Sequence, residues 1–128
     1  MTKKIITTTH APQPIGPYSA GVETGCFIFT AGQIAIDPTT GNLVEGGVAA
    51  ETRQVLLNVQ NILKAAGASL EDVVKTTVFL RDMNDFAAMN AVYAEFFVID
   101  PPARSTIAVA GLPKNVAVEI ETVAIKPS

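Results

Sequence analysis

Three residues near the C-terminal end place a cation, a hydroxyl and a carboxylate in a chain that is poor in charge: Arg104, Thr106 and Glu119. The planar guanidinium of an arginine can bind a carboxylate through two parallel hydrogen bonds, and a glutamate can take a proton from water. Side chains alternate between the two faces of a strand, so Arg104 and Thr106 are expected to point the same way. The plainer interpretation pairs Arg104 with Glu119, or leaves Glu119 as a solvated strand carboxylate. Spacing alone leaves these readings open.

Two apolar-rich runs, 105–110 and 116–121, carry Thr106 and Glu119, and Arg104 opens the first run. A Gly-Leu-Pro-Lys-Asn segment separates the two runs. Such a pattern around a short breaker segment is typical of a β-hairpin. With the turn near the middle of that segment, Thr106 and Glu119 are cross-strand neighbours and Arg104 lies one pleat further along. The sequence therefore predicts a hairpin that gathers all three side chains on one patch.

Other positions could complete a pocket around that patch. Tyr18 follows a Gly-Pro turn, where its ring can pack or its hydroxyl can donate. Asn90 lies inside a helical pattern, where an amide lowers helix propensity and needs a partner. Gly32 interrupts a strand pattern, which indicates a bulge or a close backbone approach. The single cysteine, Cys26, is expected to be a small buried apolar residue rather than a nucleophile.

Absent signatures narrow the possible chemistry. The chain has no G-x-x-x-x-G-K-[ST], G-x-G-x-x-G, H-E-x-x-H or G-x-S-x-G motif. His10 is the only histidine and lies near the N-terminus, which argues against a histidine-based triad or metal site. The acidic residues are scattered, so no metal site is expected. The net charge of −3, without a cluster of Lys and Arg, gives no electrostatic footprint for nucleic acid.

Composition predicts one domain spanning residues 1–128. One cysteine fits a reducing compartment, and no stretch has the length of a signal peptide or a transmembrane span, so a cytoplasmic protein is expected. Only 16% of the residues are charged while 48% are hydrophobic. A small domain with so little surface charge is expected to bury some of its surface against copies of itself.

The elements that must position these residues follow from periodicity. Strands are predicted over 3–8, 18–23, 26–36 and 73–81, ahead of the closing hairpin. A helix is predicted over 48–66, where apolar residues recur every three or four positions and Gly67 provides the stop. Asp82 or Asn84 can cap a second helix, whose apolar face comprises Phe86, Met89, Tyr93 and Phe96 or Phe97. Two helices can cover only one face of such a sheet, which makes an α+β fold with an apolar face left for self-association.

Four segments together resemble a known family: IGPYSAG (15–21), FTAGQIAIDPTTG (29–41), QVLLNVQNILKAAGASLEDVVKTTVFLRDMNDFAAMNAVY (54–93) and PPARSTIAVAGLPKNVAVEIE (101–121). They are similar to the Rid family, the reactive-intermediate deaminases also known as YjgF proteins. The resemblance implies a chorismate-mutase-like α+β fold, with a mixed six-stranded sheet and two helices on one face. It also implies a homotrimer with sites in the clefts between subunits, and cofactor-free hydrolysis of short 2-imino acids, such as 2-iminopropanoate and 2-iminobutanoate, to 2-oxo acids and ammonia.

The resemblance also suggests roles for single residues. It implies that Arg104 binds the substrate carboxylate, that Glu119 holds the attacking water, and that Tyr18 and Asn90 line the pocket. Two positions depart from the family pattern. Ala31, which precedes Gly32 in the strand, stands where these deaminases usually carry a serine, and Thr106 stands where they usually carry a cysteine. Thr106 can still donate and accept a hydrogen bond, whereas Ala31 cannot replace a hydroxyl.

Three functions from different classes remain. The first is the imine deaminase, which keeps both the arginine and the glutamate. The second is a non-catalytic trimeric binder of small 2-oxo carboxylates, which the missing hydroxyl at Ala31 favours. The third is an endoribonuclease or translation inhibitor, an activity ascribed to some members of the family. An acidic chain with one terminal histidine and no basic patch disfavours that third function.

Overall fold

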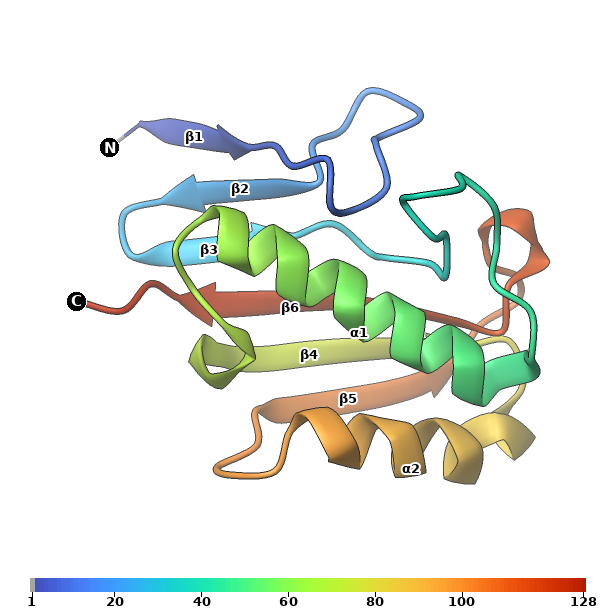
Figure 1. Ribbon diagram of the computed structural model, residues 1–128. Helices are drawn as coiled ribbons and strands as arrows, with labels where there is room; N and C mark the ends of the chain where they lie inside the picture. Colours follow the sequence, from blue (N-terminus) through green and yellow to red (C-terminus); the bar gives the residue numbers. More distant parts are fainter. Residues whose placement is uncertain (1) are drawn as a thin grey trace.

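The structure, a computed structural model, describes residues 2–128. A six-stranded sheet and two α-helices make up the fold (Figure 1). The strands are β1 (Lys3–Ile6), β2 (Gly21–Thr24), β3 (Phe27–Thr30), β4 (Val73–Leu80), β5 (Ala103–Ala108) and β6 (Val118–Ile125). The helices are α1 (Gly47–Ala65) and α2 (Phe86–Phe96), and short 3₁₀ segments span Leu70–Asp72, Met83–Asp85 and Pro113–Asn115. No helix within residues 2–128 has the length and apolar character needed to cross a membrane.

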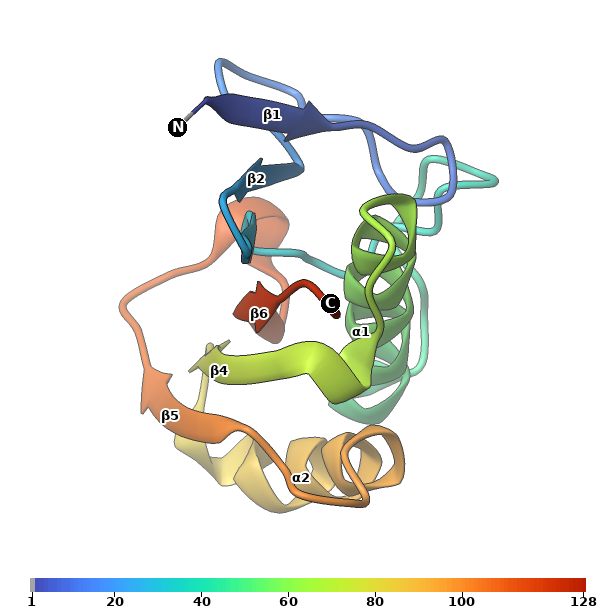
Figure 2. The same cartoon turned by 90° about the vertical axis from the view of Figure 1, so that its left-hand side faces the viewer.

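The order of strands and helices is the predicted one, and both helices lie on one side of the sheet, as expected (Figure 2). The bounds of the first strands differ from the prediction. The strand predicted over 26–36 ends at Thr30, and the one predicted over 18–23 begins at Gly21. Cys26 is exposed rather than buried, because it lies in the turn between β2 and β3 instead of in a strand.

The predicted C-terminal hairpin is wrong. β5 and β6 do not pair with each other, because β4 lies between them in the order β1-β2-β3-β6-β4-β5 (Figure 1). β4 runs antiparallel to β6 and parallel to β5, and α2 forms the crossover from β4 to β5. β4 buries alternate residues along its length, so placing it centrally satisfies both of its edges and covers its apolar face. A local turn signal between β5 and β6 carries no information about this non-local pairing.

The central position of β4 puts Arg104 and Glu119 on opposite faces of the sheet. Paired residues share a face, and Thr76, which pairs with Arg104, reaches Tyr93 of α2 with its hydroxyl. Arg104 therefore lies on the side of the helices. Ile120 is fully buried on that same side, so its neighbour Glu119 points the other way. The predicted single patch does not form within one chain.

Helix α1 provides most of the core. Its apolar stripe packs on the sheet, and the fully buried side chains of that stripe are Val55, Leu56, Val59, Ile62 and Leu63. Burial of each such side chain stabilises the fold by about 1.5–3 kcal/mol. Gly67 follows the helix with φ +81°, and the amides of Gly67 and Ala68 donate to the carbonyl groups of the last turn, as expected for a helix stop.

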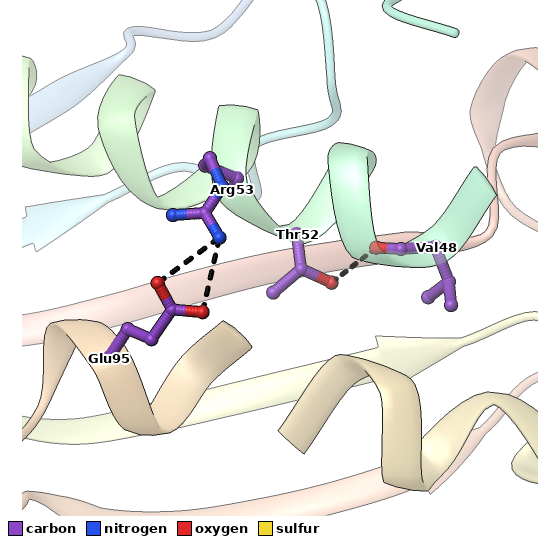
Figure 3. A network of polar contacts seen from close by, with 4 residues as sticks. All are labelled: Val48, Thr52, Arg53 and Glu95. Atoms are coloured by element: carbon purple, nitrogen blue, oxygen red, sulfur yellow. Dashed lines mark hydrogen bonds and ion pairs between the residues drawn. The ribbon is translucent and has the colours of Figure 1, made fainter. Parts of the chain in front are cut away.

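Helix α2 packs beside α1 and covers the β4–β5 end of the sheet. Its buried residues are Met89, Val92 and Tyr93. An ion pair joins the two helices at the surface, where Arg53 Nη2 lies 3.1 Å from both carboxylate oxygens of Glu95 (Figure 3). Asp82, one of the two predicted caps, accepts a hydrogen bond from the amide of Asn84 and opens the 3₁₀ turn ahead of α2.

Beyond β3 the chain bulges away from β6. Phe29 pairs with Val123 and Gln33 pairs with Ile120, so four residue steps along the chain after β3 match three residue steps along β6. One extra residue is therefore accommodated in the segment that contains Gly32. The bulge that the glycine indicated is confirmed, and it moves residues 31–36 out of the regular sheet.

The face of the sheet opposite the helices remains apolar and open in one chain. Its large exposed side chains include Phe27, Phe29, Ile107 and Ile125, each between 41% and 46% exposed. This outcome agrees with the expectation of an uncovered apolar face.

Candidate active site

Glu119 lies in a cleft of about 400 Å³ between the bulged segment and the loop before β2. Its walls are mainly apolar, and the residues that line it are Pro12, Gln13, Ile15, Tyr18, Ala20, Ala31, Gly32, Gln33, Ile34, Ile36, Pro113 and Glu119. We call this hollow the Glu119 cleft. A carboxylate among apolar walls, with few other polar groups around it, is typical of a site that binds a small molecule.

Gly32 makes room for the carboxylate of Glu119. A Cβ atom built on Gly32 would overlap Oε2 of Glu119 and would lie only 2.8 Å from its Cδ. Any side chain at this position would therefore push the carboxylate away. The close approach that was one reading of Gly32 is confirmed, and the group that approaches is Glu119.

The environment of Glu119 raises the pKa of its carboxyl group. Partial burial is the main cause, and the negative charge of Glu121 on the same strand adds to it. Within residues 2–128, no protein group donates a hydrogen bond that would stabilise the ionised form. A carboxylate with a raised pKa and free oxygen atoms is suited to accept a proton from water and to return it later.

Arg104 lies in a separate group of side chains under α2, which we call the Arg104 cluster: Arg104, Phe86, Asn90 and Tyr93. Its Nη1 donates to Oδ1 of Asn90 over 2.8 Å. Its Cζ lies 4.6 Å from the centre of the Tyr93 ring and 5.5 Å from that of Phe86. A cation over aromatic rings is held in place without being neutralised.

Arg104 has no carboxylate partner within the described part of the chain. The two salt bridges found there join Arg53 to Glu95 and Lys126 to Glu23. The ion pair of Arg104 with Glu119, which the sequence left open, is therefore absent in a single chain. The guanidinium retains donors that can bind an external carboxylate in bidentate fashion.

A buried hydrogen bond fixes the ring beneath the guanidinium. The hydroxyl groups of Thr76 and Tyr93 lie 2.7 Å apart, and both residues are buried. Burial raises the pKa of Tyr93, while the Thr76 hydrogen bond and the charge of Arg104 act against that rise. The tyrosine therefore stays neutral and serves as a rigid platform.

The structure brings some of the predicted site residues together and separates others. Tyr18, Ala31, Gly32 and Glu119 share the Glu119 cleft. The hydroxyl of Tyr18 accepts a hydrogen bond from the Ile15 amide over 3.4 Å. In contrast, Arg104 and Asn90 belong to the Arg104 cluster. Thr106 lies on the same face of the sheet as Arg104, because it pairs with the buried Val78.

The sequence pattern predicted Phe86 and Tyr93 as part of the apolar face of the helix and gave no link between them and Arg104. The signal was present as an aromatic-amide-aromatic stripe at positions 86, 90 and 93, which lie on one face of a helix. The hydrogen bonds from Asn58 to the carbonyl groups of Ile34 and Ile36 were also missed. The helical periodicity placed Asn58 with the polar residues outside the apolar stripe, and this expectation is wrong because its side chain is fully buried.

Residues 2–128 contain no group of three or more His, Cys, Asp or Glu side chains placed to hold a metal ion. His10 is exposed, and its amide bonds only the nearby Thr8 hydroxyl.

Comparison with known proteins places this geometry in a family. The model of the Endoribonuclease L-PSP family matches residues 8–126. A RutC family protein of Pyrococcus horikoshii is 56% identical over 97% of this chain and 98% of its own length. The 2-iminobutanoate/2-iminopropanoate deaminase of Salmonella typhimurium is 50% identical over 96% of this chain and 98% of its own length. The crystal structure of E. coli TdcF with bound serine has a TM-score of 0.93 and 46% identity, and the match covers 97% of this chain and 99% of that one. The chain therefore belongs to the YjgF/Rid family, whose family model carries the name Endoribonuclease L-PSP.

Proposed function

We propose that this protein hydrolyses short 2-imino acids, such as 2-iminopropanoate and 2-iminobutanoate, to 2-oxo acids and ammonia. The observation that carries the proposal is that Arg104 is fixed by Asn90 and two aromatic rings but has no carboxylate partner within residues 2–128. An arginine prepared in this way suits the carboxylate that every 2-imino acid carries. The deaminase from Salmonella and the serine-bound E. coli relative support the same class of ligand.

We infer from the opposite placement of Arg104 and Glu119 that a complete site needs two copies of the chain. Within one chain the sheet separates the two residues. The apolar face beside Glu119 is open and suited to bind a second copy, whose Arg104 cluster would then face the Glu119 cleft. In the proposed homotrimer, each of three equivalent interfaces joins one Glu119 cleft to one Arg104 cluster.

In the proposed mechanism, Arg104 holds the substrate carboxylate and thereby places the imine carbon next to a water molecule on Glu119. Glu119 takes a proton from that water while the water oxygen bonds to C2, and the electron pair of the C=N bond moves to nitrogen. Glu119 then passes this proton to the nitrogen, which gives a carbinolamine. The hydroxyl proton then passes through Glu119 to the nitrogen, the C–N bond breaks, and ammonia and the 2-oxo acid leave. Glu119 ends the cycle ionised, as it began.

A trapping assay tests the activity. An amino-acid oxidase generates 2-iminobutanoate in situ, semicarbazide traps the imine, and semicarbazone absorbance is followed with and without the protein. A deaminase lowers the rate of semicarbazone formation, and Arg104→Ala and Glu119→Gln each remove that effect. An unchanged rate with the wild-type protein would exclude the deaminase. Binding of 2-oxobutanoate without turnover would then identify a carboxylate binder.

Mixing two inactive variants tests the shared site. Arg104→Ala and Glu119→Gln subunits are unfolded together and refolded as a mixture. If each site takes Arg104 from one copy and Glu119 from the next, every mixed trimer has one intact site, and about a quarter of the wild-type activity returns. If both residues served the same site within one chain, the mixture would stay inactive. Light scattering gives the assembly directly, and a monomer mass would contradict the trimer.

A further inference from the structure

The buried amide of Asn58 contacts the chain immediately behind the Glu119 cleft. Asn58 lies in the middle of α1, and its side chain is fully buried. Its Nδ2 donates to the carbonyl oxygen of Ile34 over 3.2 Å and to that of Ile36 over 2.9 Å. Its Oδ1 accepts from Nε2 of Gln54, one turn earlier on the helix, over 2.9 Å. Both donors and the acceptor of the amide are thus engaged.

The carbonyl groups that Asn58 binds belong to the wall of the cleft. Ile34 and Ile36 both line the Glu119 cleft. This segment lies outside the regular strands. Isolated bridges join Gln33 to Ile120 and Ile36 to Leu43, and the amide of Ile36 bonds the carbonyl oxygen of Ile34, but residues 34–36 belong to no continuous ladder. Without a continuous ladder, the backbone depends on side chains for its position. Asn58 is the buried side chain from the helix layer that supplies those bonds.

The chemistry of the proposed reaction assigns a role to this wall. The carboxylate of a 2-imino acid is directed to Arg104 and the imine carbon to the water on Glu119. The third substituent on C2, the side chain, is left to the apolar remainder of the cleft, which includes Ile15, Ile34, Ile36 and Pro113. A small side chain makes few contacts there, whereas a branched side chain must pack against the wall.

We propose that Asn58 is a positioning residue that fixes the Ile34–Ile36 wall and thereby determines how well the cleft accepts 2-imino acids with larger apolar side chains. The inference rests on the proposed deaminase function. Asn58 touches no substrate; it acts through the backbone of the wall. Loss of its bonds lets the wall move, which weakens binding of a side chain that packs on the wall more than binding of one that does not reach it.

The test compares two substrates, 2-iminopropanoate and 2-imino-4-methylpentanoate, generated from alanine and leucine by amino-acid oxidases. For Asn58→Ala, the ratio of kcat/KM for the large substrate to that for the small one is expected to fall about three- to tenfold, mainly through a higher KM for the large substrate. Gln54→Ala leaves the Asn58 amide in place but frees it to turn, and is expected to lower the ratio less. This second variant keeps the test open if Asn58→Ala folds poorly.

Thr52→Val is the matched control. Thr52 is also fully buried on α1, but its hydroxyl donates to a carbonyl of its own helix, that of Val48 over 2.7 Å (Figure 3), and not to the carbonyl groups of Ile34 and Ile36. A residue that only supports the helix lowers both kcat/KM values together, so this variant is expected to leave the ratio unchanged. An unchanged ratio in Asn58→Ala and Gln54→Ala would overturn the proposal.

Hydrogen exchange separates this inference from the proposed function. In the wild-type protein the amides of Gln33 and Ile36 are bonded to the carbonyl oxygens of Ile120 and Ile34, and they are expected to exchange slowly. Asn58→Ala is expected to speed exchange over residues 31–36 more than over β4, whereas Thr52→Val does not. If wild-type protein turned over neither imine, the deaminase function would fall, and faster exchange over 31–36 would still support Asn58 as the residue that fixes the wall. Unchanged exchange there would overturn it.

Discussion

The Glu119 cleft and the Arg104 cluster lie on opposite faces of one sheet, and their environments have opposite effects on the charged group that each contains. In the Glu119 cleft, burial and Glu121 disfavour the charged form of a carboxylate to which no group of the described residues donates a hydrogen bond. In the Arg104 cluster, two aromatic rings and an amide favour a cation and hold it still. In the proposed mechanism, the first region keeps a proton acceptor reactive, while the second keeps a binding group rigid. Each is incomplete alone, which is why we infer that they meet between copies of the chain.

Removal of the cation has the largest expected effect on this division of roles. Arg104→Ala should lower kcat/KM by at least about thirtyfold, since truncation of one partner of a desolvated charge pair costs about 2–5 kcal/mol. The loss should appear mainly as a higher KM in steady-state kinetics. Arg53→Ala is the control. The guanidinium of Arg53 also lies near a ring, 5.9 Å from the centre of Phe96, but it is already paired with the carboxylate of Glu95. Equal losses in both variants would show that Arg104 has no special part in binding.

A displaced carboxylate is expected to have the next largest effect. Gly32→Ala puts a methyl group where the Glu119 carboxylate lies. We expect kcat to fall by about tenfold to a hundredfold, because a displacement of about 1 Å at a reacting group costs that much. Gly111→Ala is the matched control, since a Cβ there meets no atom within 4 Å. A crystal structure of Gly32→Ala with Glu119 unmoved and activity lost would contradict this explanation.

Two substitutions of Tyr93 distinguish its ring from its hydroxyl. Tyr93→Leu removes the ring beneath Arg104 and should raise KM several-fold, a cation–π contact being worth about 0.5–2 kcal/mol. Tyr93→Phe keeps the ring but leaves the buried Thr76 hydroxyl without its partner. That variant should lose about 1–3 kcal/mol of unfolding free energy in urea titration with little change in KM. A large KM change in Tyr93→Phe would show that the hydroxyl itself contributes to binding.

The smallest expected effect concerns pH. Glu119 must be ionised to accept a proton, so kcat/KM should fall as the pH drops through its raised pKa. Glu121→Gln removes the nearby negative charge, which lowers the pKa of Glu119 and moves the acidic limb of the profile to lower pH. The shift should be less than about one pH unit, because burial, the larger cause, remains. Glu71→Gln, in the 3₁₀ segment before β4, is the control and should leave the limb in place. A limb that moves to higher pH in Glu121→Gln would contradict the assignment.

The sequence was informative about features that depend on residues close together in the chain. The apolar stripe of α1, its stop at Gly67, the alternation along β4 and the glycine bulge at position 32 all follow from neighbours within a few residues. The types of residue suited to the chemistry, an arginine and a glutamate in a chain with few charges, were also visible. The exposed Cys26 shows the limit of such reasoning, since a turn one residue away decides whether a position is buried.

What only the tertiary structure decided was which strands are neighbours. A turn segment between two apolar runs favours a hairpin locally, but β4, from some thirty residues earlier in the chain, pairs with both runs and separates them. Strand pairing depends on backbone hydrogen bonds and on burial of whole faces, and these are summed over the complete sheet. Periodicity determines which residues alternate along a strand; it does not determine which strand lies next to it. For this reason the sequence alone identified Arg104 and Glu119 as the residues to examine, whereas the fold placed them on opposite faces.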